Sequence, residues 1–277
     1  MKTRRNFLKQ SSLFGAATLI MPQLSCAAPK NSTYGVQLYS FRDSMLKNPK
    51  KTLEEIASLG FKEIESAGSV KGYYYGLTPS EMEQTCKDLG MKITSGHVRL
   101  DDKFEQTMED AVASGQEYLI CSSMPSDGQT VDNYKKVAEQ FNVAGEACKK
   151  LGLKFGYHNH EYEFDSENGQ VLYDVLMDNT QNDLVNMELD LGWVVVAGKD
   201  PISYFKKYPG RFPLWHLKDM DMTKKESTEF GKGALDISLM LNNKELSGVE
   251  HIFIEQEEYA STPFESMKYN MDYLKKI

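Results

Sequence analysis

The chain repeats a short pattern in which an amphipathic helical run ends in Leu-Gly and an apolar strand follows directly. Three segments show the pattern most clearly: LEEIASLGFKEIE, EQTCKDLGMKITSGH and GEACKKLGLKFGYHNH. Gly60, Gly90 and Gly152 suit the left-handed backbone position that ends a helix. Because strands that alternate with helices pair in parallel, this repeat predicts a parallel sheet covered by helices.

Extending the pattern along the chain predicts eight strands, each followed by a helical stretch. The strands are expected at 34–40, 61–65, 92–97, 117–122, 153–158, 185–190, 212–217 and 250–256. The helices are expected at 49–59, 79–89, 102–114, 130–151, 168–179, 200–208, 236–246 and 263–276. Eight such units in roughly 249 residues predict a single (β/α)8 TIM barrel of the α/β class. An open doubly wound sheet is the alternative, but it favours a glycine-rich turn where this chain has LYSFRD.

The first 28 residues are predicted to be an export signal outside the barrel, which is expected to cover 33–277. A basic start, MKTRRNFLKQ, precedes a short apolar run, SLFGAATLIM, and then small residues. TRRNFLK resembles a twin-arginine signal, and an ordinary secretion signal is the alternative. The sequence therefore predicts an exported, periplasmic protein. Lipidation of Cys26 would make it a lipoprotein, although Gln23 fits that motif poorly, and a membrane is expected as a partner only in that case.

Charge and cysteine content exclude several classes of partner. Removing residues 1–28 takes away four of the 32 basic residues and none of the 40 acidic ones, which leaves a net charge of −12. Such an acidic surface argues against nucleic acid and anionic membranes as partners. Cys86, Cys121 and Cys148 are odd in number and widely spaced, so they predict buried apolar side chains rather than a disulfide framework.

Ionisable residues gather at the predicted carboxyl ends of the strands, where barrel enzymes carry their chemistry. These residues are Glu65, His97, His158, His160, Asp190, His216, Lys218, Glu255 and Glu257. Side chains alternate along a strand, so residues two apart, such as His158 and His160, face the same side. His251 begins the last strand at the opposite end of the barrel and is expected to be structural.

Four of these residues form a predicted metal site. His158, Asp190, His216 and Glu255 come from four neighbouring strands, and imidazole and carboxylate ligands suit Mn²⁺, Mg²⁺, Co²⁺ or Zn²⁺. A hydrogen-bonded polar residue at the barrel mouth is the alternative interpretation for each one alone. A mouth with so many ionisable groups indicates a function, so one divalent metal ion is expected.

A series of short motifs resembles those of a known protein family. YGVQLYSFRD, LGFKEIE, YYYGLTPSEM, MKITSGH, YHNHEYEF, LDLGWVVVAGKDP, WHLKDMD, FGKGALD and IFIEQ follow one another in this order. Over about 33–277 the chain resembles the xylose isomerase-like TIM-barrel superfamily, often labelled sugar phosphate isomerase/epimerase. HNH…EF followed by HLKD is typical of one branch.

The resemblance implies a metal held by Glu, Asp, His and Glu from strands five to eight. Asp190, His216 and Glu255 match the last three positions. His158 stands where many relatives have Glu, as in the myo-inosose dehydratase branch, and is expected to be the first ligand. His160, Glu161 or a site with three protein ligands are the alternatives.

The expected chemistry is proton removal beside a sugar carbonyl that the metal chelates. His160 is predicted to be the base, with support of the metal site as its alternative role. Lys218 is predicted to stabilise the oxyanion or protonate a leaving group, or else to form an ion pair with Asp219 or Glu257. Glu65, His97 and Glu257 are predicted to bind substrate.

Three neighbouring segments have weaker interpretations. Glu163 either reaches the substrate or lies in a solvated loop. One of the tyrosines in KGYYYGL either covers a sugar ring or packs on helices. FGKGALD is expected to form a tight turn with Lys232 near the mouth, and Trp215 is expected to lie in the core.

The predicted function is a metal-dependent isomerase or epimerase of a small carbohydrate, an unphosphorylated sugar or keto-sugar. Export argues against phosphorylated substrates. The first alternative is a lyase or dehydratase that acts by β-elimination on 3-keto-glycosides or related keto-sugars. The second is a non-catalytic sugar-binding barrel.

Overall fold

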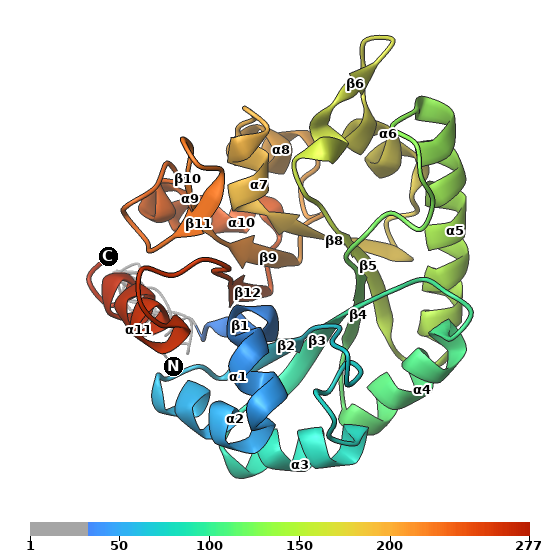
Figure 1. Ribbon diagram of the computed structural model, residues 1–277. Coiled ribbons are helices and arrows are strands. Elements are labelled where there is room, and N and C mark those ends of the chain that lie inside the picture. The colour runs from blue at the N-terminus through green and yellow to red at the C-terminus, as the bar shows by residue number, and fades with distance from the viewer. Residues whose placement is uncertain (1–32) are drawn as a thin grey trace, which may run out of the picture. The chain divides into compact units, whose positions relative to one another are not determined.

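The computed structural model describes residues 33–277, which fold as a closed barrel of eight parallel strands (Figure 1). The barrel strands are β1 (Gly35–Gln37), β2 (Glu63–Ser66), β3 (Lys92–Val98), β4 (Tyr118–Cys121), β5 (Lys154–His158), β8 (Val185–Asp190), β9 (Leu214–Leu217) and β12 (His251–Ile254). Pairing of β12 with β1 closes the sheet. The predicted TIM barrel is therefore confirmed, and the open doubly wound alternative is wrong.

The predicted signal peptide, residues 1–28, and Cys26 lie outside the described residues. Within residues 33–277, no helix combines the length and the apolar character needed to cross a bilayer. Cys86, Cys121 and Cys148 are buried free thiols, as expected.

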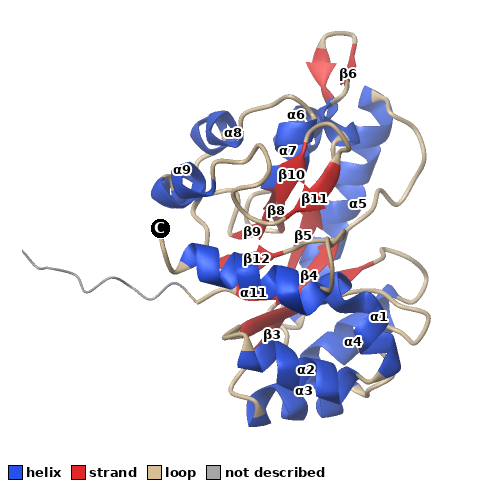
Figure 2. Ribbon diagram, turned by 60° about the vertical axis from the view of Figure 1, so that its left-hand side comes forward, coloured by secondary structure: helices blue, strands red, loops and turns tan. Residues whose placement is uncertain are grey.

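Helices surround the strands on all sides (Figure 2). They are α2 (Pro49–Ser58), α3 (Pro79–Asp88), α4 (Phe104–Ser114), α5 (Val131–Lys150), α6 (Leu172–Asn179), α8 (Pro201–Lys207), α9 (Ile237–Asn242), α10 (Lys244–Ser247) and α11 (Pro263–Leu274). Gly60, Gly90 and Gly152 have positive φ angles of 99°, 68° and 77°, as the Leu-Gly pattern predicted. The expected helix 236–246 divides into α9 and α10.

The repeat did not reveal the short elements around the barrel mouth. The expected first strand, 34–40, stops at Gln37, because Leu38–Phe41 form the 3-10 helix η1, which leads into α1 (Arg42–Lys47). Further along lie η2 (Tyr162–Phe164), α7 (Leu191–Val196) and the two-stranded sheets β6–β7 (Ser166–Glu167, Gln170–Val171) and β10–β11 (Asp219–Asp221, Glu226–Thr228). The β6–β7 hairpin projects from the barrel in Figures 1 and 2.

The barrel interior changes from apolar to polar along its axis. Tyr118, Ile120, Leu214 and Phe253 form a buried apolar cluster of their own. Because side chains two apart share a face, the residues that follow Leu214 and Phe253 on the same side are His216 and Glu255. The barrel interior is therefore apolar below and polar at the mouth. Trp215, which points the opposite way, is fully buried and stacks on Phe205 of α8 with ring centroids 4.9 Å apart, which confirms its core role.

Candidate metal centre at the barrel mouth

The mouth contains two levels of ionisable side chains. We call the deeper level the inner tier, and it consists of Glu65, His97 and Glu188. The level above it, the outer tier, consists of Asp190, Lys218 and Glu255. His158 and His216 lie between the tiers, because each has one ring nitrogen beside a carboxylate of each tier.

The outer face of this arrangement fits a divalent metal. Asp190, His216 and Glu255 each offer a ligand atom, and these atoms lie within 4.8 Å of one another. The fourth predicted ligand, His158, belongs to a second such group with His97, Glu188 and His216, and its Nε2 lies 3.9 Å from Asp190 Oδ2. All four residues are buried, and the buried Asp190 Oδ2 has no partner of hydrogen-bond geometry but lies 3.0 Å from Lys218 Nζ. Two carboxylates and two imidazoles form the nitrogen and oxygen donor set that such cations bind.

The alternative first ligands do not join this cluster. Among the described residues, neither His160 nor Glu161 belongs to a group of side chains that could hold a metal ion. His158 is in the group that shares His216 with this cluster, so its place as the first ligand stays a prediction.

Sequence reasoning missed Glu188, the centre of the inner tier. Its Oε2 lies 2.7 Å from His97 Nε2, 3.1 Å from His158 Nδ1 and 3.2 Å from His216 Nε2. Glu65 Oε1 lies 2.6 Å from His216 Nε2 and 3.2 Å from His97 Nε2. The signal for Glu188 was present, because it precedes Asp190 by two residues and therefore faces the same side of the strand.

Charges set the protonation of the three imidazoles. Burial together with His216 and His97 lowers the pKa of His158 well below its ordinary value, so this ring is neutral. Burial opposes a charge on His97 as well, but Glu65 and Glu188 raise its pKa to about 9. Burial is likewise outweighed at His216, where Glu188 and Glu255 hold the pKa well above its ordinary range.

Lys218 lies among three carboxylates, those of Asp190 and Glu255 in the outer tier and that of Glu257. Its Nζ is 2.6 Å from Glu255 Oε2, 2.8 Å from Glu257 Oε1 and 3.0 Å from Asp190 Oδ2. Burial disfavours the ammonium, yet these partners raise the pKa of Lys218 well above its ordinary value. The predicted ion pair with Glu257 is present, whereas the one with Asp219 is wrong. Asp219 instead accepts backbone N–H bonds from the FGKGALD segment, including those of Gly231 and Gly233.

Local hydrogen bonds orient the Asp190 side chain toward His216 and Glu255. Its Oδ1 accepts the Trp193 N–H at 2.9 Å and so caps α7, which leaves Oδ2 to face the site. Asn159, the middle residue of HNH, accepts the Asp190 N–H at 3.1 Å and ties the end of β5 to the end of β8. Gly192 lets α7 approach β9, because a Cβ there would lie 2.7 Å from the Lys218 carbonyl oxygen.

His160 lies beside the cluster with its ring at the cavity wall. Its Nδ1 is buried without a hydrogen-bond partner, and burial followed by the charge of Lys218 lowers its pKa to about 4. Glu163 fixes the loop, because it accepts the His160 N–H at 2.9 Å and a hydrogen bond from the Tyr157 hydroxyl. The solvated interpretation of Glu163 is wrong, since its side chain is fully buried and burial raises its pKa to about 7.

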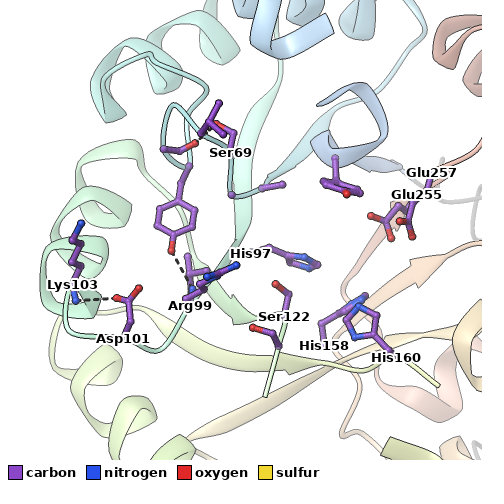
Figure 3. A pocket seen from close by; sticks show the side chains of 18 of the residues that line it. Ser69, His97, Arg99, Asp101, Lys103, Ser122, His158, His160, Glu255 and Glu257 are labelled. Carbon is purple, nitrogen blue, oxygen red and sulfur yellow. Dashed lines mark hydrogen bonds between the residues drawn. The ribbon is translucent and has the colours of Figure 1, made fainter. Parts of the chain in front are cut away.

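A cavity of about 910 Å³ opens above these residues (Figure 3). One end is lined by His97, His158, His160, Lys218, Glu255 and Glu257, and the other by Ser69, Tyr73, Arg99, Asp101 and Lys103. Two of the predicted substrate-binding residues, His97 and Glu257, thus reach the cavity. Glu65 does not line it, because its carboxylate is held beneath by His216 and His97, so its predicted contact with substrate is corrected.

Within the tyrosine loop, Tyr74 and Tyr75 belong to the core, as the packing interpretation predicted, whereas Tyr73 packs against the core and also lines the cavity.

Together, the fold and the site define a class of parallel barrel proteins with a His, Glu and Asp cluster suited to a divalent metal at the strand ends. Residues 53–277 match the family described as Xylose isomerase-like TIM barrel, and the chain belongs to this family.

The chain is also similar to individual relatives and solved structures. An inosose dehydratase of Clostridium perfringens is 34% identical over 127 residues, which cover 44% of this chain and 42% of the relative. The chain spans about half the length of the curated relatives it matches. A sugar phosphate isomerase/epimerase from Parabacteroides distasonis has 28% identity and a TM-score of 0.79, covering 88% of this chain and 98% of that one.

A third similarity concerns the fold alone. The solved IOLI protein with a bound zinc atom shares 15% identity and a TM-score of 0.70, covering 88% of this chain and 97% of the other.

Proposed function

We propose that this protein is a metal-dependent carbohydrate enzyme that removes a proton beside the carbonyl of an unphosphorylated keto-sugar or keto-cyclitol and then expels a β-substituent. The observation that carries the proposal is the buried cluster of Asp190, His216 and Glu255, with His160 and Lys218 beside it on one cavity. The naming of curated relatives as inosose dehydratases supports a lyase over the isomerase that the sequence favoured.

The proposed ligand atoms are His158 Nε2, Asp190 Oδ2, His216 Nδ1 and Glu255 Oε2, and the cation is Mn²⁺, Mg²⁺, Co²⁺ or Zn²⁺. When bound, such a cation would acidify the C–H next to a chelated carbonyl and stabilise the negative charge that follows. His216 Nδ1 lies 2.9 Å from Glu255 Oε2 and would give up its proton on metal binding.

His160 and Lys218 would move the protons. The neutral His160 imidazole takes the proton from carbon, and the C–H electron pair forms a C=C bond as the bond to the β-oxygen breaks. Lys218 protonates the departing oxygen, and its three carboxylate neighbours hold its Nζ in place. The products are an enone and water or an alcohol, without any change in overall redox state.

The volume of the cavity supports a substrate larger than a single ring. Its volume of about 910 Å³ lies near the top of the range of roughly 300–1,000 Å³ for ligand pockets. Ser69, Tyr73 and Arg99 line the end away from His160, and none of them belongs to the metal cluster. This end offers room for a leaving group that is itself a ring, as in a keto-glycoside.

The second candidate is the isomerase or epimerase activity predicted from the sequence. It is favoured by the 28% identical Parabacteroides distasonis structure that carries this description. The same base would return its proton to the opposite face of the carbon or to the neighbouring carbon, and no group would leave. Export to the periplasm remains part of the proposal, and N-terminal sequencing of the protein recovered from periplasmic extract would test it.

One NMR experiment separates these activities. Manganese-loaded protein is incubated in D₂O with free ketoses, an inosose and 3-keto-glycosides, and products are followed by ¹H NMR after chelation of the metal. An enone with release of water or aglycone supports the lyase. Deuterium in an isomer or epimer without cleavage would overturn the lyase in favour of the second candidate. Bound sugar without any exchange would leave only a sugar-binding barrel.

A further inference from the structure

Glu188 contacts three imidazoles through one oxygen atom. Its Oε2 is 2.7 Å from His97 Nε2, 3.1 Å from His158 Nδ1 and 3.2 Å from His216 Nε2. The side chain is fully buried, and its second oxygen, Oε1, has no hydrogen-bond partner. Glu188 does not line the cavity; it either orients the histidines around it or joins His97, His158 and His216 in a group that could hold a metal ion.

The direction of these hydrogen bonds fixes the tautomer of His158. The carboxylate Oε2 accepts from His97 Nε2 and His158 Nδ1, so the hydrogen of the His158 ring lies on Nδ1. The opposite nitrogens, His158 Nε2 and His216 Nδ1, each lie 3.9 Å from Asp190 Oδ2. A histidine binds metal through a nitrogen that carries no proton, so His158 turns an available nitrogen toward the outer tier, whereas His216 Nδ1 lies 2.9 Å from Glu255 Oε2 and donates to it.

We propose that Glu188 is a positioning residue that selects the metal-binding tautomer of His158. The proposal rests on the metal site of the proposed function. Glu65 is the closer partner of His216, because its Oε1 lies 2.6 Å from His216 Nε2, whereas Glu188 Oε2 lies 3.2 Å away. Glu188 thus orients a ligand of the neighbouring strand, β5, from its own strand, β8.

His97 supplies the positive charge that this inner tier needs. Two buried carboxylates would repel each other without a counter-charge. His97 Nε2 lies between them, 2.7 Å from Glu188 and 3.2 Å from Glu65.

The test compares Glu188→Leu, Glu188→Gln and wild type. Leucine removes the acceptor, so we expect a 10- to 100-fold weaker Mn²⁺ affinity by competition with a fluorescent chelator. Glutamine can place its carbonyl oxygen where Oε2 lies, so it should retain the tautomer and lose less than tenfold. Long-range ¹H–¹⁵N correlation of metal-free protein labelled at histidine reports the tautomers directly, and His158 should leave its Nδ1–H form only in the leucine variant.

Glu63→Leu is the matched control. Glu63 Oε2 accepts a hydrogen bond from His251 Nδ1 at 2.7 Å in a similar pair at the opposite end of the barrel. This variant should change Mn²⁺ affinity by no more than twofold.

Three outcomes would overturn the proposal. The first is an unchanged Mn²⁺ affinity in Glu188→Leu. The second is an equal loss of affinity in the leucine and glutamine variants, which would assign the effect to charge alone. The third is two metal ions per wild-type chain, which would make Glu188 a ligand itself. Wild type that binds no Mn²⁺ would refute the proposed metal site instead, and the tautomer spectrum would still decide the role of Glu188. If Glu188→Leu does not fold, the glutamine spectrum decides alone, since loss of the His158 Nδ1–H form there refutes the proposal.

Discussion

Replacing Lys218 by methionine should expose how strongly the outer carboxylates depend on a cation. Lys218 Nζ lies within 3.0 Å of Asp190, Glu255 and Glu257, and its side chain is buried. Methionine keeps most of the apolar stem but removes the charge. Removing one partner of a buried ion pair costs about 3–5 kcal/mol, because the other partner stays buried without a counter-charge.

That loss converts into a measurable change in thermal unfolding. For a domain of this size, 1 kcal/mol corresponds to about 2–4 °C in melting temperature. Metal-free Lys218→Met should therefore melt roughly 6–20 °C below wild type in circular dichroism scans with a chelator. Adding Mn²⁺ should narrow this gap, because a cation between Asp190 and Glu255 replaces the missing charge, whereas in wild type it must share those oxygens with Lys218.

Lys207→Met provides the control for loss of a lysine. Lys207 Nζ lies 2.7 Å from Asp174 Oδ2, but its side chain is half exposed, so its replacement should cost less than about 1 kcal/mol. If metal-free Lys218→Met melts within 2 °C of wild type, the counter-charge reasoning fails. If the gap is the same with and without Mn²⁺, the metal does not use the carboxylates that Lys218 contacts.

Three further predictions concern the ligands, the base and the buried glutamate. Asp190→Ala with Glu255→Ala should reduce metal content from about one ion per chain to none by elemental analysis while the circular dichroism spectrum is kept, and retained metal would refute the ligand assignment. His160→Ala should keep its metal but stop exchange of substrate hydrogen with D₂O, and persistent exchange would identify another base. Glu163, whose pKa is raised from 4.5 to about 7, keeps its proton in the folded state longer than in the unfolded state as pH rises. The stability of wild type relative to Glu163→Gln should therefore fall by up to about 3 kcal/mol between pH 4.5 and 7 in urea titrations, and a constant difference would contradict the burial effect.

The periodic parts of the molecule could be predicted from the sequence because they follow from backbone geometry. The Leu-Gly repeat located the barrel strands, and their carboxyl ends then placed His158, Asp190, His216 and Glu255 at one end of the barrel. Strand β8 has the bounds that the sequence predicted, Val185–Asp190. Once a parallel barrel closes, its strand ends must meet at one mouth, so the residues there can be grouped without knowing any distance.

The parts that could not be predicted depend on contacts between distant segments. Alternation could have indicated Glu188, but it does not tell which nitrogen of His216 faces which carboxylate, since that depends on the register of β9 against β8 and β12. Glu163 looked like a loop residue because its burial comes from the turn at Tyr162–Phe164, which has no repeating pattern. The cavity wall at Arg99 lies in an irregular loop for the same reason.

His158 on β5 and the buried Glu188 belong to one arrangement. His158 Nδ1 lies 3.1 Å from Glu188 Oε2, so a glutamate at position 158 would bring two carboxylates together in a buried site. Like charges so close raise the pKa of one partner and leave it protonated, which removes a metal ligand. Conversely, Glu188 without the imidazoles would be a buried charge with too few donors. With a neutral imidazole at position 158, the proposed ligand set carries only the charges of Asp190 and Glu255, which match a divalent cation. The third carboxylate, Glu188, lies in the inner tier, where it orients His158.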